Sequence, residues 1–282
     1  MAARLTRLQV DRFRAEGYLT GLPLLSPAEA ASIRRRIESF ERKRPTDAGW
    51  AFDIKANLLF DWVYRIGADG RALDLAESLL GPNLLNTNTV FRIKEPGSRT
   101  GYGWHQDAAR IGTEPGFVIL YLSITESTPE NGGLMVIPGT HTRVQPYDLV
   151  VNPDGQARRR VARVREVDAG KAVDLALEPG AAAIFSSNLI HGSAPNRSPA
   201  RRIAILTDYT AAHARQSIGR GSGQLVRGID RWGRFEPEPI PTGTCTRRSV
   251  LMRRRMLTDY PENPLLGPRE TDGPVEFPDA SD

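Results

Sequence analysis

The chain has 282 residues, of which 40% are hydrophobic and 25% charged, and a formal net charge of +5. These values suit one large or two small globular domains and exclude a disordered or fibrous chain. No apolar run is long enough to cross a bilayer, no apolar segment follows the basic N-terminus as in a secretory signal, and the single cysteine, Cys245, cannot form an internal disulfide. We therefore expect a cytoplasmic protein.

The positive charge does not indicate a polyanionic partner. Basic residues cluster at 34–36, 158–160 and 253–255, but no aromatic residues alternate with them as a nucleic-acid stacking surface requires. Solvated surface is the better interpretation, so we expect neither a nucleic-acid nor a membrane partner. The oligomeric state cannot be inferred from this pattern.

The first eighty residues or so favour helix. Leu8 and Phe13 indicate a short opening helix. Ser26 can cap a second helix, Pro27 suits its first position and Glu29 can return a hydrogen bond to the cap. Helices are predicted from about 27 to 44, near 58–66 and at 71–80.

From about residue 83 the pattern changes to short strands separated by Gly and Pro turns, which favours a sandwich or barrel. A β core over about 83–210 would then follow N-terminal helices over about 1–80. After it, we expect a loop at 219–223, an extended segment at 236–241, a basic helix at 249–257 and a mobile tail at 261–282. Strands are predicted at 84–94, 117–124, 134–137, 172–177, 181–186 and 202–209.

The residues most able to carry chemistry are His105, Asp107 and His191. His105 and Asp107 are two apart, so on a strand or strand end they point to the same face, and His191 begins a later predicted strand. Two imidazoles and one carboxylate on one side of a metal leave the opposite positions open, which is the ligand set of non-haem Fe(II) oxygenases. Each residue alone is a weak signal, and the combination carries the hypothesis.

Around these residues the chain resembles the phytanoyl-CoA dioxygenase-like branch of Fe(II)/2-oxoglutarate-dependent oxygenases, over roughly residues 8–235. The resemblance implies a double-stranded β-helix, which is a cupin-like jelly roll: a mainly β fold with flanking helices, in a single domain over 1–260. The motifs that carry it are Phe91-Arg92-Ile93-Lys94-Glu95-Pro96-Gly97, Trp104-His105-Gln106-Asp107, Thr128-Pro129-Glu130-Asn131-Gly132-Gly133, Ile137-Pro138-Gly139-Thr140-His141 and His191-Gly192-Ser193-Ala194-Pro195-Asn196-Arg197-Ser198.

By this resemblance His105, Asp107 and His191 are the catalytic iron ligands, and a later arginine binds 2-oxoglutarate through its planar fork. Arg201 and Arg202 are both candidates, but neighbours on a strand face opposite ways. The family has a small residue two positions after that arginine and an aromatic residue seven after it. Ala204 and Tyr209 fulfil both only for Arg202, which we therefore choose.

Two further residues are assigned to the cosubstrate by the same resemblance. Ser193 matches a serine that helps hold its carboxylate, although a turn residue is nearly as good an interpretation. Tyr121 lies on the strand after the loop of His105 and Asp107 and is expected to line the cosubstrate or substrate pocket, with core packing as the alternative. Lys94 and Gln106 are weaker candidates. Trp104 is expected to pack beside the metal loop, and His141 to be structural.

The resemblance implies a dioxygenase that uses Fe(II), 2-oxoglutarate and O2, releases succinate and CO2, and hydroxylates a small molecule, in specialised metabolism. Related halogenases have Gly or Ala where this chain has Asp107, so the carboxylate argues against halogenation. Substrate-binding residues are unknown. Specificity is expected from loops near 52–57, 99–102, 158–165 and 219–231.

Two alternatives remain at this point. One is a metal-dependent jelly-roll isomerase or hydrolase, whose turnover would not need 2-oxoglutarate. The other is a non-catalytic jelly roll that binds a small molecule and takes up no stoichiometric Fe(II).

Overall fold

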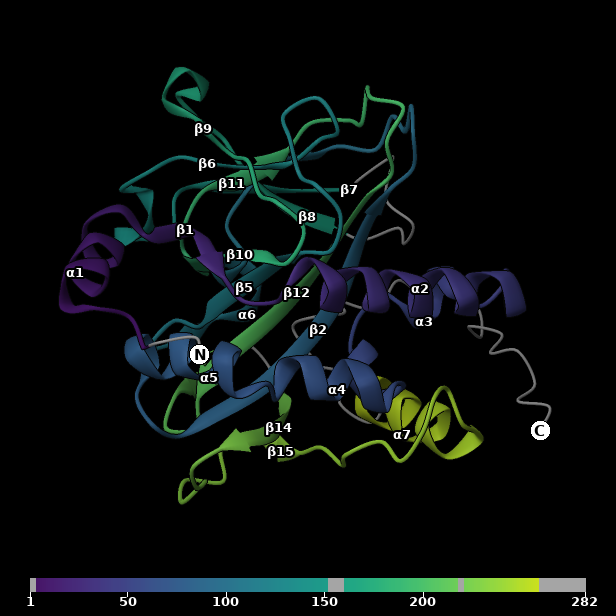
Figure 1. Ribbon diagram of the computed structural model, residues 1–282. Helices are drawn as coiled ribbons and strands as arrows, with labels where there is room; N and C mark the ends of the chain where they lie inside the picture. Colours follow the sequence, from purple (N-terminus) through teal and green to yellow (C-terminus); the bar gives the residue numbers. More distant parts are fainter. Residues whose placement is uncertain (1–3, 152–159, 218–220, 259–282) are drawn as a thin grey trace.

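The computed structural model describes residues 4–151, 160–217 and 221–258 and shows a double-stranded β-helix with helices packed outside it (Figure 1). A seven-stranded sheet has the order β1-β10-β5-β12-β2-β14-β15, and a six-stranded sheet has the order β7-β8-β3-β11-β6-β9. The bounds of the strands are β1 Tyr18–Pro23, β2 Leu84–Lys94, β3 Tyr102–His105, β4 Thr113–Glu114, β5 Val118–Ser123, β6 Leu134–Val136, β7 Tyr147–Val151, β8 Arg160–Val164, β9 Val173–Leu175, β10 Ala181–Ser186, β11 His191–Ser193, β12 Arg202–Ala211, β13 Arg215–Gln216, β14 Ser222–Arg227 and β15 Glu236–Pro237.

Helices α2, α4 and α5 lie on the outer face of the seven-stranded sheet, where they run across β2 and β12 (Figure 1). The predicted capping of the second helix is confirmed: Ser26 accepts a hydrogen bond from the Glu29 backbone, and the Glu29 side chain accepts one from the Ser26 backbone. The bounds of the helices are α1 Arg7–Glu16, α2 Pro27–Lys43, α3 Ala48–Ala51, η1 Ala56–Leu58, α4 Asp61–Gly67, α5 Gly70–Leu80, α6 Ala108–Ile111, η2 Thr140–Thr142, η3 Ala169–Lys171 and α7 Arg247–Thr258.

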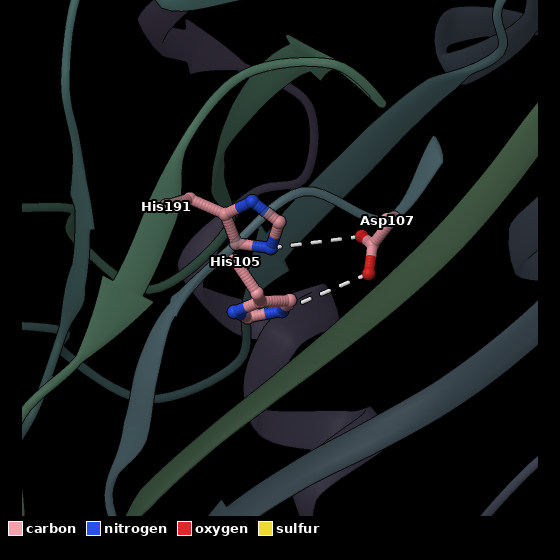
Figure 2. A group of neighbouring side chains, drawn as sticks. All are labelled: His105, Asp107 and His191. Carbon is pink, nitrogen blue, oxygen red and sulfur yellow. Dashed lines mark ion pairs between the residues drawn. The ribbon is translucent and has the colours of Figure 1, made fainter. Parts of the chain in front are cut away.

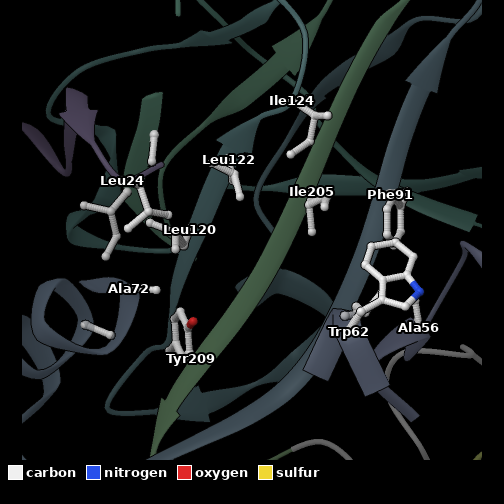
Figure 3. Close-up of a cluster of buried hydrophobic side chains, with 14 of the residues drawn as sticks. Leu24, Ala56, Trp62, Ala72, Phe91, Leu120, Leu122, Ile124, Ile205 and Tyr209 are labelled. Carbon is white, nitrogen blue, oxygen red and sulfur yellow. The ribbon is translucent and has the colours of Figure 1, made fainter. Parts of the chain in front are cut away.

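Two hydrophobic clusters follow from the alternation of side chains along the strands. One side of each long strand packs against the helices: Leu120, Leu122, Ile205 and Phe91 lie on this side of the sheet and belong to an outer cluster, in which Trp62 of α4 contacts Phe91 (Figure 3). The other side faces the six-stranded sheet and forms an inner cluster, which includes Tyr121, Phe185, Val136 and Ala204. Burial of both faces of the seven-stranded sheet makes it the rigid scaffold on which inward-pointing polar residues are held.

The sequence predicted most elements but missed several short strands. β2 has the predicted bounds, and the strands at 117–124, 172–177 and 181–186 are present with shorter or equal bounds. β1, β3, β7 and β8 were not predicted, because they are short or contain Gly, Pro or charged residues and are stabilised by their partner strands.

The strand that starts at Arg202 is not the last one, and the β structure extends past residue 210. Ser222 and Gly223 lie in β14, which pairs antiparallel with β2, so the loop predicted at 219–223 is wrong at its C-terminal end. The basic helix is present as α7. The tail predicted at 261–282 lies outside the described residues. Within the described part of the chain, no helix combines the length and apolarity of a membrane span.

Candidate active site

The two predicted histidine ligands lie directly opposite each other on paired strands. His105 ends β3, His191 begins β11, and the antiparallel register pairs them. Their ring centroids are 4.1 Å apart. Both rings turn the same edge towards Asp107, with His105 Nε2 3.7 Å and His191 Nε2 3.6 Å from its carboxylate oxygens (Figure 2). The structure therefore brings together all three residues that the sequence singled out.

Backbone carbonyls fix the protonation pattern of both imidazoles. His105 Nδ1 lies 2.8 Å from the Gly103 carbonyl oxygen, and His191 Nδ1 lies 3.0 Å from that of Leu189. A carbonyl only accepts, so each Nδ1 carries the hydrogen and each Nε2 presents its lone pair to the space beside Asp107. Burial and the nearby His105 lower the pKa of His191 to about 4, which keeps its ring neutral near pH 7.

Asp107 reaches this position from a different local structure than predicted. It is not on a strand: its backbone is helical and it is the N-cap residue of α6. Gln106 holds the turn between β3 and α6, since its side-chain amide donates to the carbonyl oxygens of Arg143 and Asn188 and accepts from the Gln145 backbone. The predicted convergence on one face is right, but a clamped turn produces it.

The three side chains fit a divalent transition metal. One donor atom from each lies within 4.8 Å of the other two, and no other such group occurs among the residues that the structure describes. Two neutral imidazole nitrogens and one carboxylate oxygen suit Fe(II), and their grouping on one side leaves the opposite side for other ligands. His105 and Asp107 are partly exposed, so small ligands can reach them.

A buried cluster of cationic and hydroxyl side chains lies further along the same interior. Arg202 is only 2% exposed, and its guanidinium donates to the Tyr121 hydroxyl at 2.6 Å. Arg202 Nε is buried without a hydrogen-bond partner in the described structure. A buried guanidinium with an unused donor and no anion beside it is costly, so a carboxylate ligand would complete its hydrogen bonds. The choice of Arg202 over Arg201 is consistent with this burial.

Lys94 and Ser193 belong to the same cluster. Lys94 pairs with Arg202 across β2 and β12, and its ammonium donates to Ser193 Oγ at 2.8 Å and to the carbonyl oxygens of Gly132 and Ala194. Burial and the neighbouring Arg202 lower the pKa of Lys94 to about 7. The close approach requires glycine at 132, since a Cβ there would lie 2.3 Å from the Ala194 oxygen.

The other histidine and tryptophan predictions are consistent with structural roles. Trp104 packs with Ile137, Val164 and Ile190 beside the metal loop. His141 lies away from the triad, where its Nε2 contacts the Arg14 carbonyl oxygen at 3.1 Å. Of the residues proposed for specificity loops, 158–159 and 219–220 lie outside the described residues.

Two charged residues that the sequence analysis did not select also face the interior. Arg92 pairs with Ala204, and Asp208 lies on β12 on the same face as Arg202. The signal was available in principle, because Asp208 is six residues after Arg202 and side chains alternate along a strand. Whether Asp208 has a partner in the interior depends on neighbouring residues that only the tertiary structure brings together.

Comparisons with known proteins agree with this geometry. The family model described as Phytanoyl-CoA dioxygenase (PhyH) matches residues 13–204. The methylphosphonate hydroxylase of Gimesia maris is 26% identical over 75% of this chain and 83% of its own length, and the ectoine dioxygenase of Nocardia farcinica is 27% identical over 72% and 77%. The solved structure of the non-heme monooxygenase ThoJ in its apo form covers 88% of this chain and 94% of its own, with a TM-score of 0.78 and 26% identity.

Proposed function

This chain belongs to the phytanoyl-CoA dioxygenase family of Fe(II)- and 2-oxoglutarate-dependent dioxygenases, and from that premise we propose that it hydroxylates a small molecule with His105, Asp107 and His191 as the iron ligands. The observation that carries the assignment is the convergence of three donor atoms within 4.8 Å, with both imidazoles set to offer Nε2. Family membership argues against the two alternatives that the sequence left open.

The residues of the chain hold and orient the metal and its ligands, while the metal supplies the oxidation chemistry. Bound Fe(II) would supply O2-dependent oxidation of the substrate, coupled to conversion of 2-oxoglutarate to succinate and CO2. His191 is 5% exposed and neutral, so it offers a ligand without losing a proton. Asp107 supplies the one negative charge of the triad and occupies the position that a halide would need, which supports hydroxylation rather than halogenation.

We assign 2-oxoglutarate to the pocket of Arg202, Tyr121, Ser193 and Lys94. Arg202 would take the far carboxylate through the donors that it does not use within the chain, and the Tyr121 hydroxyl fixes the orientation of the guanidinium. Lys94 lies on the Ser193 side of the same pocket and adds a second positive group. Burial of these groups excludes water, which strengthens their interaction with an anion.

Two further expectations belong to this proposal. We place the enzyme in the cytoplasm, which its single and buried cysteine, Cys245, supports. We also propose that one jelly-roll domain spans residues 1–260, that the substrate is a small molecule of specialised metabolism, and that neither nucleic acid nor membrane is a partner.

The test is 2-oxoglutarate-dependent succinate release in the presence of Fe(II), with candidate small molecules added in turn. We expect release to require both Fe(II) and 2-oxoglutarate and to increase when a substrate is present. Turnover of any substrate without 2-oxoglutarate would sink the assignment, as would a protein that binds no Fe(II).

A further inference from the structure

The inner face of β12 leads from the cosubstrate pocket to a second polar group. Its inward residues are Arg202, Ala204, Leu206 and Asp208. The sheet register pairs Asp208 with Ile119 of β5 and pairs Ile119 with Phe185 of β10. The Phe185 ring lies 4.9 Å from the His191 ring. Asp208 is therefore level with the triad, roughly 10 Å across the sheet from Phe185 at the usual strand spacing.

Asp208 is held in place through one oxygen only. Asn88 donates to Asp208 Oδ2 at 3.1 Å, and the Lys55 backbone N–H donates to the Asn88 oxygen at 2.9 Å. Within the described residues the other carboxylate oxygen makes no hydrogen bond, although the residue is only 7% exposed. Asp208 lines a narrow cavity together with Lys55, Thr113, Thr210 and the end of α6 at Ile111. The Asp208 carboxylate oxygen that makes no hydrogen bond therefore belongs to a residue that lines this cavity.

Among the described residues, no cation lies within ion-pair distance of this carboxylate, although Arg92 and Lys55 act on it from further away. Asp208 makes no ion pair there, and the nearby Lys55 ammonium is bound to Glu238 and to the backbone oxygens of Thr87 and Ser222. Burial, and then the charge of Asp107, raise the pKa of Asp208 to about 7, while the hydrogen bond from Asn88 and the charges of Arg92 and Lys55 act in the opposite direction. A carboxylate that is oriented by Asn88 but has no ion-pair partner among the described residues is completed by a cationic ligand.

Arg92 is the complementary group on the neighbouring strand. It pairs with Ala204, so its side chain enters the same interior as Asp208. Its guanidinium lies over the Tyr102 ring, 5.2 Å from the centroid, and 4.0 Å from Asp53. With 30% of its side chain exposed, it remains accessible to a ligand. Arg92 and Asp208 make no ion pair with each other in the described structure, so two opposite charges face the interior separately.

We propose that the substrate is a small amphoteric molecule, whose protonated amine is bound by Asp208 and whose anionic group is bound by Arg92. This inference rests on the proposed function, because it places the ligand beside the triad. The narrow cavity at Asp208 suits a compact ammonium group, and Arg92 provides the planar donor pair that a carboxylate takes. Recognition at two points by opposite charges would orient the bonds between them relative to His105, Asp107 and His191.

The test uses the standard L-amino acids, their Nα-acetyl derivatives and their methyl esters as probes. Succinate release is measured with Fe(II) and 2-oxoglutarate, and the shift in unfolding temperature is measured on metal-free and Ni(II)-loaded protein. We expect one or more free amino acids to give both signals. Acetylation removes the cation and esterification removes the anion, so each should weaken the response by about tenfold or more, the range for a charged hydrogen bond.

Three variants assign the preference to residues. Asp208→Asn should abolish the discrimination between free and acetylated amines, and Arg92→Gln that between acids and esters. Thr210→Val is the control, because it alters the same cavity wall without removing a charge and should leave both preferences unchanged. Titration of each variant with Ni(II) and 2-oxoglutarate separates a lost substrate site from a lost metal site.

Three results would overturn the proposal. The first is an acetylated, esterified or neutral probe that acts as strongly as its parent. The second is an amine preference that survives Asp208→Asn. The third is a protein that binds Ni(II) and 2-oxoglutarate but responds to no amphoteric probe. If Ni(II) does not bind, the triad assignment fails, while the thermal shift of the metal-free protein still reports the charge preference.

Discussion

Arg201 and Arg202 are consecutive, yet their side chains lie on opposite sides of the seven-stranded sheet. Arg201 is bound to Glu41 of α2 and to Glu95 on the outer side, with its Nε 2.7 Å from Glu95. Arg202 is buried inside and donates to Tyr121. The two residues therefore provide a matched pair of variants: equal in chemistry and adjacent in sequence, but only one of them lies in the proposed cosubstrate pocket.

Arg202→Ala is expected to raise the KM for 2-oxoglutarate by at least about tenfold, since it removes charged hydrogen bonds to a carboxylate in a buried site. Fe(II) affinity should change little. Arg201→Ala should leave that KM near its original value and lower the unfolding temperature instead, because its partners Glu41 and Glu95 lie outside the pocket. Succinate-release kinetics over a range of 2-oxoglutarate concentrations measure both. The reverse pattern would mean that the register assigned to this strand is off by one.

Removal of either histidine of the triad is expected to abolish stoichiometric metal binding. His105→Ala and His191→Ala each leave two ligands, and turnover should fall to background. His213→Ala is the control, since this exposed ring lies near Trp232, 5.6 Å between centroids, and not at the triad. Anaerobic Fe(II) titration with calorimetric Ni(II) titration checks this. A variant of the triad that still took up one equivalent at this site would refute the ligand assignment.

Binding of 2-oxoglutarate is expected to take up a proton near pH 8. Without the ligand the pKa of Lys94 is about 7, so at pH 8 most Lys94 amines are neutral. An anionic ligand stabilises the charged form and raises this pKa, which draws in a proton; below about pH 6 Lys94 is already charged and the uptake disappears. Calorimetry of Ni(II)-loaded protein in buffers of different ionisation enthalpy measures the uptake. Lys94→Met should show none, and equal uptake in that variant would count against the assignment.

The lowered pKa of Lys94 also makes the free energy of unfolding depend on pH. Because its pKa is lower in the folded than in the unfolded chain, the unfolded state holds more protons between about pH 7 and 10. The contribution of Lys94 to stability therefore rises with pH through this window. Urea unfolding at several pH values should show a steeper rise for the original protein than for Lys94→Met.

We expect the buried ion pair Lys55–Glu238 to contribute more to the free energy of unfolding than an exposed ion pair does, because it joins the segment around Glu238 to the interior. Both side chains are fully buried, and Glu238 also accepts from Ser222 Oγ at 2.6 Å. Glu238→Gln leaves the Lys55 charge without a counter-charge and should destabilise the fold by about 3 kcal/mol. The exposed pair Arg12–Glu16 is the control, where Arg12→Ala should cost less than about 1 kcal/mol. Urea unfolding measures both, and equal effects would contradict the expectation.

The sequence determined the elements whose information is local. Ser26 and Glu29 define a helix start by their own hydrogen bonds, and the alternation of side chains separates Arg201 from Arg202 without reference to any partner. The motifs around His105 and His191 were sufficient to identify the family and to select three residues that the fold brings together. The strands β3, β7 and β8 were missed, because strands of this length are formed by pairing rather than by their own residues.

Tertiary structure alone decided which polar groups are left without partners. Lys55 and Asp208 are both buried in the interior, but Lys55 pairs with Glu238 far along the chain, whereas among the described residues the side chain of Asp208 is bound only by the amide of Asn88. No spacing in the sequence distinguishes the two residues. Charge balance in a protein interior depends on distances between segments that are remote in the chain. The sequence by itself therefore determined the family and the residues to consider for the metal, whereas only the tertiary structure decided which buried charges have an ion-pair partner.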